Sequence, residues 1–73
     1  MACVSPDGRP TESGAKILIA IAAAPLTPEQ AAEGTGLPLF KVRSGLREMV
    51  QAGLAVESGE TYSATERGTE FAH

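Results

Sequence analysis

Two arginines, Arg43 and Arg47, stand four residues apart near the middle of the chain, with Lys41 close by. Residues at this spacing lie on one face of an α-helix, so the two guanidinium groups are expected to point the same way. Such cations can neutralise phosphates, and the planar fork of arginine also fits the edge of a guanine. The alternative is a solvated helix surface with weak ion pairs to Glu33 or Glu48. The residues alone leave both interpretations open.

An aromatic residue, Phe40, is expected on the same helix face. An exposed phenylalanine there could contact a partner protein or the methyl group of a thymine. Alternatively, the ring packs against the first helix or the hairpin of the fold. The sequence leaves these alternatives open as well.

Other side chains with reactive chemistry are scarce. Cys3 and Asp7 lie near the N-terminus and His73 at the C-terminus, so no nucleophile has a base beside it in the pattern. The soft metal ligands Cys3 and His73 cannot form a metal cluster by themselves. Gly34 and Gly36 fall short of a glycine-rich phosphate loop. We therefore expect no enzymatic activity, no metal site and no small-molecule cofactor.

The composition is that of a folded, weakly acidic protein. Of the 73 residues, 42% are hydrophobic and 21% are charged, with a formal net charge of −3 and a pI of about 4.9. This length allows one domain. Proteins that bind nucleic acid usually carry a basic face, so DNA binding would depend on the local distribution of charge and not on its average.

The single cysteine and one apolar segment of the sequence bear on the location of the protein in the cell. Cys3 is the only cysteine, which excludes an internal disulfide and predicts a reducing, cytoplasmic location. The apolar run from Ile17 to Ala24 follows Lys16, as in a targeting signal. It is much shorter than the roughly 20 residues of a membrane span, so we expect a buried helix and no membrane contact.

The N-terminal region divides into a tail and a first helix. Residues 1–14 combine turn formers with few large apolar residues, which predicts a disordered tail before a domain of residues 15–73. Apolar residues then recur every three or four positions, as on the buried side of a helix, until Pro25 ends the segment. The predicted buried stripe comprises Ile17, Leu18, Ile21 and Ala24.

A second helix is predicted to begin after Thr27. This threonine can accept a hydrogen bond from an unpaired amide, Pro28 suits the first helical position, and Gln30 can reach back to the cap. Gly34 and Gly36 can adopt the left-handed conformations that end a helix. The segment is therefore expected to be a short helix followed by a tight turn.

A third helix is predicted over residues 38–52, with Pro38 in its first turn and Gly53 closing it. One face is apolar at helical spacing, and the opposite face carries the cations. The residues expected in the core are Leu39, Val42, Leu46, Met49 and Val50.

The C-terminal region predicts a hairpin and a last helix. Residues 54–57 and 61–64 are predicted to form two strands around a loop of Ser58, Gly59 and Glu60. Thr65 is then expected to cap a short helix anchored by Phe71.

The order of these elements and several of their residues match a known family. The matching positions are Leu26 to Glu33, Thr35 to Pro38, Val42, Leu46-Arg47, Met49, Ala52 to Leu54 and Tyr62 to Gly68. In these segments the chain resembles the MarR and ArsR types of bacterial transcription regulator. The resemblance implies an α+β fold, the winged helix-turn-helix, with a three-helix core, a C-terminal two-stranded wing and a short final helix.

By that resemblance, the helix over residues 38–52 is a recognition helix that enters the major groove of double-stranded DNA. The protein would then be a DNA-binding transcription regulator, acting as a homodimer or with a larger protein partner. The DNA-binding residues that the resemblance implies are Leu39, Phe40, Lys41, Arg43, Ser44 and Arg47.

Several features depart from the family pattern. The wing carries Glu57 and Glu60 but no lysine or arginine, so it would repel phosphate. Ala31 stands where the family commonly has a larger apolar residue, and the dimerisation helices of full-length regulators are missing. The net charge of −3 favours an alternative function, a winged-helix module that uses Phe40 and the acidic wing to bind a protein and does not bind DNA.

Overall fold

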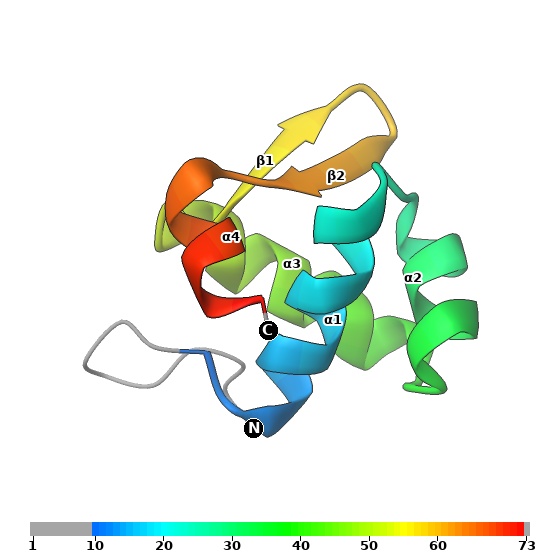
Figure 1. Cartoon of the computed structure of the whole chain (residues 1–73). Helices are drawn as coiled ribbons and strands as arrows, with labels where there is room; N and C mark the ends of the chain where they lie inside the picture. Colours follow the sequence, from blue (N-terminus) through cyan, green and yellow to red (C-terminus); the bar gives the residue numbers. More distant parts are fainter. Residues whose placement is uncertain (1–9, 73) are drawn as a thin grey trace.

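Helices form the first part of the chain, and a hairpin with a short helix forms the rest (Figure 1). The computed structural model describes residues 10–72, which make up a small α+β domain. Within this range, no helix combines the length and the apolar character needed to cross a membrane. The elements are α1 (Glu12–Ala23), α2 (Pro28–Thr35), α3 (Leu39–Gln51), β1 (Ala55–Ser58), β2 (Thr61–Ala64) and α4 (Glu66–Phe71).

The first helix, α1, begins earlier than the sequence predicted. It starts at Glu12, and the Thr11 hydroxyl accepts a hydrogen bond of 3.4 Å from the amide of Gly14. The expected boundary at Ala15 is therefore wrong by three residues, because Thr11 supplies an N-terminal cap. The part of the predicted tail over residues 1–9 lies outside the described residues.

The inner face of α1 provides a large share of the core. Ile17, Leu18 and Ile21 are buried, as predicted. Ala24 is exposed and lies past the end of the helix in extended conformation, so its assignment to the buried stripe was wrong. Pro25 follows directly and prevents the helix from continuing.

The second helix, α2, begins with the predicted capping box. The Thr27 hydroxyl accepts from the Gln30 amide at 3.2 Å, and the Gln30 side chain accepts from the Thr27 amide at 3.0 Å. Pro28 occupies the first turn, where no amide hydrogen is needed. The helix ends at Gly36, whose φ of 77° is left-handed, whereas Gly34 remains helical and is not a stop.

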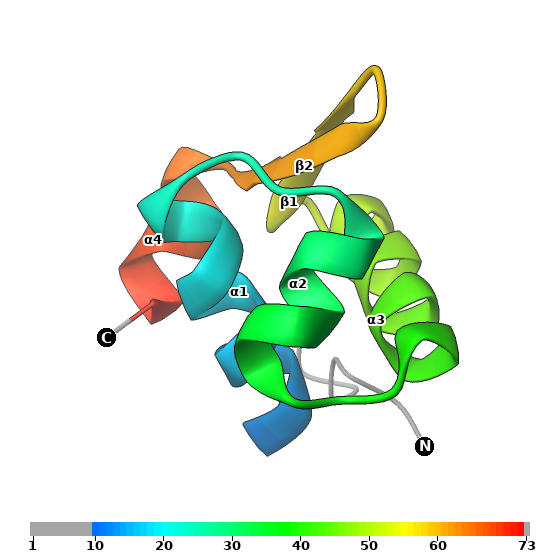
Figure 2. The ribbon, with the colours of Figure 1, turned by 90° about the vertical axis from the view of Figure 1, so that its right-hand side faces the viewer.

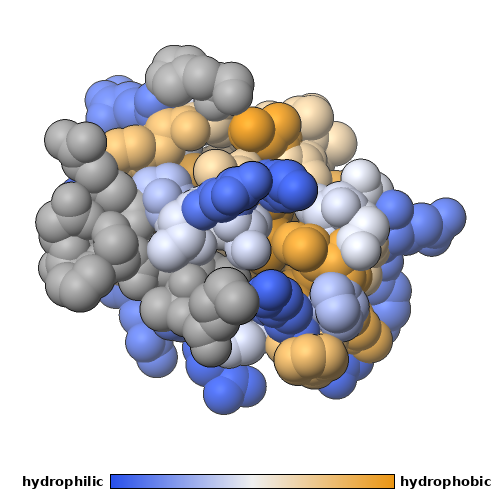
Figure 3. All heavy atoms as spheres, turned by 90° about the horizontal axis from the view of Figure 1, so that it is seen from below, coloured by the Kyte–Doolittle hydropathy of each residue, from blue (hydrophilic) through white to orange (hydrophobic). Residues whose placement is uncertain are grey.

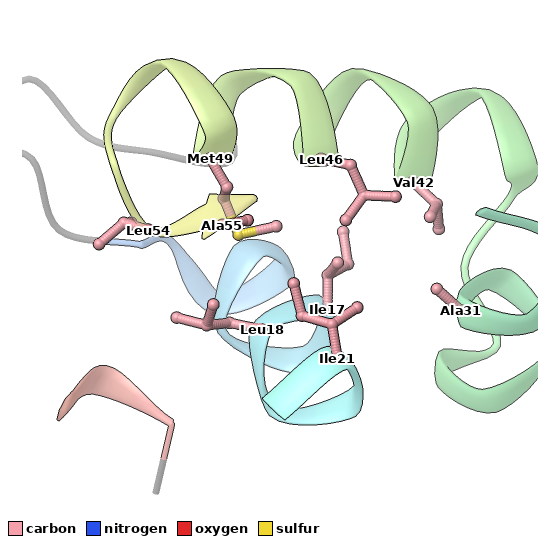
Figure 4. Packing of buried hydrophobic residues seen from close by; sticks show 9 residues of the cluster. All are labelled: Ile17, Leu18, Ile21, Ala31, Val42, Leu46, Met49, Leu54 and Ala55. Carbon is pink, nitrogen blue, oxygen red and sulfur yellow. The ribbon is translucent and has the colours of Figure 1, made fainter. Parts of the chain in front are cut away.

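The third helix, α3, has one face turned into the domain. Leu46 is fully buried, and the side chains of α3 and α1 point toward one another in the core (Figure 4). Leu39 and Val50 were also expected in the core, but 36% and 37% of their surfaces are exposed, because both lie at the edges of the buried face. The buried residues of α3 are Val42, Gly45, Leu46 and Met49.

The C-terminal cap of α3 ends the helix and directs the backbone into the hairpin. Gly53 has a φ of 79°, and its amide donates to the Val50 carbonyl at 3.1 Å. The Leu54 amide donates to the Met49 carbonyl at 2.8 Å. These two bonds form the Schellman motif, which confirms Gly53 as the glycine that closes the helix.

Strands β1 and β2 pair in antiparallel orientation, from Ala55 opposite Ala64 to Ser58 opposite Thr61. The connection therefore has two residues, one fewer than predicted, because Ser58 belongs to the ladder. Gly59 takes the first loop position with a φ of 61°, which suits a tight hairpin turn. The hairpin projects beyond the helices (Figure 2).

A short extended segment before α2 supports the base of this hairpin. The Leu26 amide donates to the Tyr62 carbonyl at 3.0 Å, and the Tyr62 amide donates to the Leu26 carbonyl at 2.7 Å. These bonds occupy the edge of β2 that β1 leaves open. The hairpin is thus tied to the start of α2 as well as to the end of α3.

The last helix, α4, closes the domain beside α1. Thr65 caps it by accepting from the Gly68 amide at 3.1 Å, and the half-buried Phe71 packs against the core, as predicted. A side chain at Gly68 would overlap the carbonyl oxygen of Leu54, so only glycine fits there. The face opposite the hairpin intersperses hydrophobic and hydrophilic residues (Figure 3).

Candidate nucleic-acid interface

The solvent side of α3 carries a continuous polar stripe that starts with an aromatic ring. Its members follow one another at intervals of three or four residues and therefore share one helix face. None of them is acidic, since Glu48, the only carboxylate of α3, is half-buried outside the stripe. The exposed stripe of α3 consists of Phe40, Arg43, Ser44, Arg47 and Gln51.

The stripe includes four of the six residues predicted to contact DNA. Phe40 has 76% of its surface exposed, so the alternative in which its ring packs against the first helix or the hairpin is wrong. Leu39 lies at the margin of the core, and Lys41 is half-buried beside the stripe. The structure therefore brings together Phe40, Arg43, Ser44 and Arg47, with Leu39 and Lys41 at the borders.

An ion pair connects α3 to the first turn of α2. The Arg43 guanidinium lies 3.9 Å from the Glu29 carboxylate, and the two side chains are 61% and 63% exposed. The solvated-surface alternative pairs the cations of this face with Glu33 or Glu48, whereas the packing of α2 against α3 brings Glu29 beside Arg43. An exposed pair at this distance contributes at most about 1 kcal/mol, so Arg43 can readily change partners.

A groove of about 900 Å³ runs beside α3, bounded by the start of α2 and by the hairpin. Arg43 and Arg47 lie on the α3 side of this groove. Glu29 belongs to the α2 wall, and Glu57 and Glu60 belong to the hairpin wall. The three elements that surround the groove are visible in Figure 2. The groove thus combines two cations with three carboxylates.

Strand alternation explains why an acidic side chain of the hairpin faces α3. Side chains two residues apart lie on the same face of a strand, so Glu57 shares a face with the buried Ala55. Tyr62 is directly opposite Glu57 in the ladder, and its hydroxyl donates to the Glu57 carboxylate at 2.9 Å. This hydrogen bond fixes one carboxylate on the hairpin wall.

The same hydrogen bond changes the acidity of the tyrosine. It raises the pKa of Tyr62 above its ordinary value of 10.0, and desolvation and the charge of Glu57 act in the same direction. The positive charges of Arg47 and Arg43 oppose this rise. Both arginines therefore lie close enough to the hairpin wall to interact with it electrostatically.

No pattern in the sequence indicates that Glu29 belongs to this site. Glu29 and Arg43 are far apart in the chain, and a pair of this kind follows only from the packing of two helices. The position of Glu29 in the first turn of α2 already has a local explanation, since an acidic residue there interacts favourably with the helix dipole.

Within residues 10–72, no group of three or more histidine, cysteine, aspartate or glutamate side chains could hold a metal ion.

Comparisons with known proteins return no family model, no curated sequence and no solved structure that matches this chain. The function of the groove and of the exposed stripe is therefore inferred from the residues of this chain.

Proposed function

We propose that this chain is a winged helix-turn-helix domain that binds double-stranded DNA through the exposed stripe of α3 and regulates transcription. The observation that carries the proposal is the exposed pair Arg43 and Arg47, one helical turn apart on a face of α3 that bears no carboxylate of its own. Arginine is the residue that most often contacts guanine specifically in the major groove.

The arrangement of elements supports the winged-helix part of the proposal. The helices α2 and α3, joined by the turn at Gly36, have the order of a helix-turn-helix with α3 second. The bridge between Leu26 and Tyr62 ties the hairpin to the segment before α2, and the hairpin lies across the groove from α3, as a wing would. In such a motif the second helix enters the major groove and the first crosses the backbone.

The spacing along α3 suits neighbouring base pairs. Arg43 and Arg47 are separated by about 6 Å along the helix axis, since each residue rises about 1.5 Å. Successive bases of a strand are about 3.4 Å apart, so the two guanidinium groups can reach bases about two steps apart. Phe40, one turn nearer the start of α3, can contact the methyl group of a thymine.

The domain offers few phosphate contacts of its own, because its hairpin carries no lysine or arginine. A specific protein–DNA interface usually buries more surface than one small module provides. We therefore propose that the chain acts as a homodimer or with a larger protein partner that supplies the remaining affinity.

A titration of labelled duplex DNA at about 50 mM and about 200 mM salt tests the proposal, because phosphate contacts make affinity depend on salt. Wild type should bind. The double variant Arg43→Ala with Arg47→Ala should lose binding at least about tenfold, since a guanine contact is worth about 1–3 kcal/mol. Its thermal midpoint should stay close to wild type, because exposed positions change stability by about 0.5 kcal/mol or less.

A matched control removes two cations elsewhere. Lys16→Ala with Arg67→Ala makes the same change in net charge on α1 and α4, where both side chains are exposed. If this control loses as much affinity as the α3 variant, net charge and not the α3 stripe governs binding. If wild type binds no duplex at micromolar concentration in low salt, the DNA-binding proposal is rejected.

A second candidate function, a module that binds another protein, is favoured by the exposure of Phe40 next to an acidic groove. Aromatic residues are enriched at protein interfaces, and the carboxylates would attract a basic partner. This candidate predicts that wild type shows no affinity for DNA even at low salt.

A further inference from the structure

We infer that Glu29, Glu57 and Glu60 are specificity-determining residues that keep DNA phosphates out of the groove and leave Arg43 and Arg47 available for base edges. The inference rests on the proposed function, because it concerns the DNA that the same arginines would bind. It goes further by assigning a role to carboxylates that a DNA-binding surface would otherwise be expected to lack.

Geometry places the carboxylates on both sides of the arginines. Glu29 lies 3.9 Å from Arg43 on the α2 side. On the other side, the hydroxyl of Tyr62 holds the Glu57 carboxylate at 2.9 Å, and Glu60 lines the groove at the hairpin turn. A phosphate that approached either guanidinium inside the groove would therefore meet negative charge from α2 or from the hairpin.

Sequence-independent binding depends on neutralising phosphates, because these charges are the same in every duplex. Carboxylates beside the arginines weaken this mode through repulsion between like charges. A base edge in the major groove carries no net charge and is recognised by hydrogen bonds, so it is affected less. The acidic walls consequently lower the affinity for arbitrary DNA more than the affinity for a preferred sequence.

Arg43 can exchange its present partner for a base edge because that ion pair is weak. The Arg43 to Glu29 pair is long and solvent-exposed, so a bidentate contact with guanine can replace it. In the free protein the pair directs the guanidinium group toward α2. Glu29 thereby competes with phosphate for the same cation.

The test uses isosteric neutral variants and two duplex probes. Glu57→Gln with Glu60→Gln neutralises the hairpin wall, and Glu29→Gln neutralises the α2 wall. The control, Glu66→Gln with Glu70→Gln, makes the same charge change as the hairpin pair on α4, where both glutamates are exposed. One probe contains only A·T pairs and therefore no guanine, and the other is rich in guanine.

The double variant Glu57→Gln with Glu60→Gln, here the hairpin pair, should bind the A·T duplex about three- to tenfold more tightly than wild type at low salt. Added salt should reduce this gain, because it screens the charges. The preference of the hairpin pair for the guanine-rich duplex should shrink, and its salt dependence should steepen. Glu29→Gln should act in the same direction with a smaller effect. The α4 control should change the affinity for both duplexes little and equally.

The outcomes separate this inference from the proposed function. If wild type binds DNA through the two arginines and the hairpin pair gains no more than the α4 control, the inference is wrong and the proposed function stands. If only the neutralised variants bind DNA, the carboxylates prevent binding altogether instead of selecting a sequence, and both the inference and the proposed function are wrong. If neither wild type nor any glutamine variant binds either duplex, both are wrong.

Discussion

The inner and outer faces of α3 belong to one helix of thirteen residues but are held in place by different forces. On the inner face, Val42, Leu46 and Met49 are completely removed from solvent. On the outer face, Arg43 and Arg47 are exposed, and the ion pair between Arg43 and Glu29 is weak. Changes to the inner face should therefore act on stability, and changes to the outer face on binding.

The largest expected effect comes from Leu46, which faces α1 at the centre of the core (Figure 4). Leu46→Ala should lower the free energy of unfolding by about 2–5 kcal/mol, because it leaves a cavity in addition to the lost burial. A domain this small has about 5 kcal/mol or little more to lose, so much of the protein should unfold. Chemical denaturation followed by circular dichroism measures the change.

The matched control on the outer face is Ser44→Ala, which lies on the same helix and should change stability by about 0.5 kcal/mol or less. A Leu46→Ala protein that unfolds cooperatively at the wild-type denaturant concentration would contradict the assignment of the inner face. Equal losses in both variants would show that the two faces do not differ as described.

Local signals in the sequence predicted much of the fold that supports these faces. The capping box between Thr27 and Gln30 joins residues within one turn, so both partners can be recognised together. The end of α3 at Gly53 is equally local, since its left-handed conformation favours glycine. The predicted elements with such signals all appear, with shifts of one to three residues at some ends.

Features that depend on packing could not be predicted in the same way. Gly34 and Gly36 are equally able to end a helix, and only the fold shows that the second one does. Leu39 and Val50 have the spacing of core residues but lie where the buried face ends. The partner of Arg43 depends on how α2 packs against α3, which no local pattern encodes.

A smaller effect is expected at Phe40, the first residue of the exposed stripe. Replacing thymine by uracil in a duplex removes one methyl group, which is worth about 0.8 kcal/mol when buried, or about fourfold in affinity. Wild type should prefer the thymine duplex by up to this factor. Phe40→Ala should lose the preference and keep its thermal stability, since 76% of the residue's surface is exposed.

Two results would change this interpretation of Phe40. A variant that still distinguishes thymine from uracil would show that another residue contacts the methyl group. A large fall in the melting temperature would show that the ring stabilises the fold, contrary to its exposure.

The smallest expected effect is the titration of Tyr62, which reports on the contact between the hairpin wall and the outer face of α3. It is the only tyrosine, and the chain has no tryptophan, so phenolate absorbance follows this residue alone. Its pKa should lie above 10.0, chiefly because its hydroxyl donates to Glu57. Because the raised pKa favours the neutral phenol in the fold, this contribution to stability is present below pH 10 and is lost as the pH rises through the folded-state pKa.

Glu57→Gln should lower the pKa of Tyr62 toward 10.0, and Arg47→Ala should raise it further. A pKa that does not respond to Arg47→Ala would show that the hairpin wall and α3 are not electrostatically coupled.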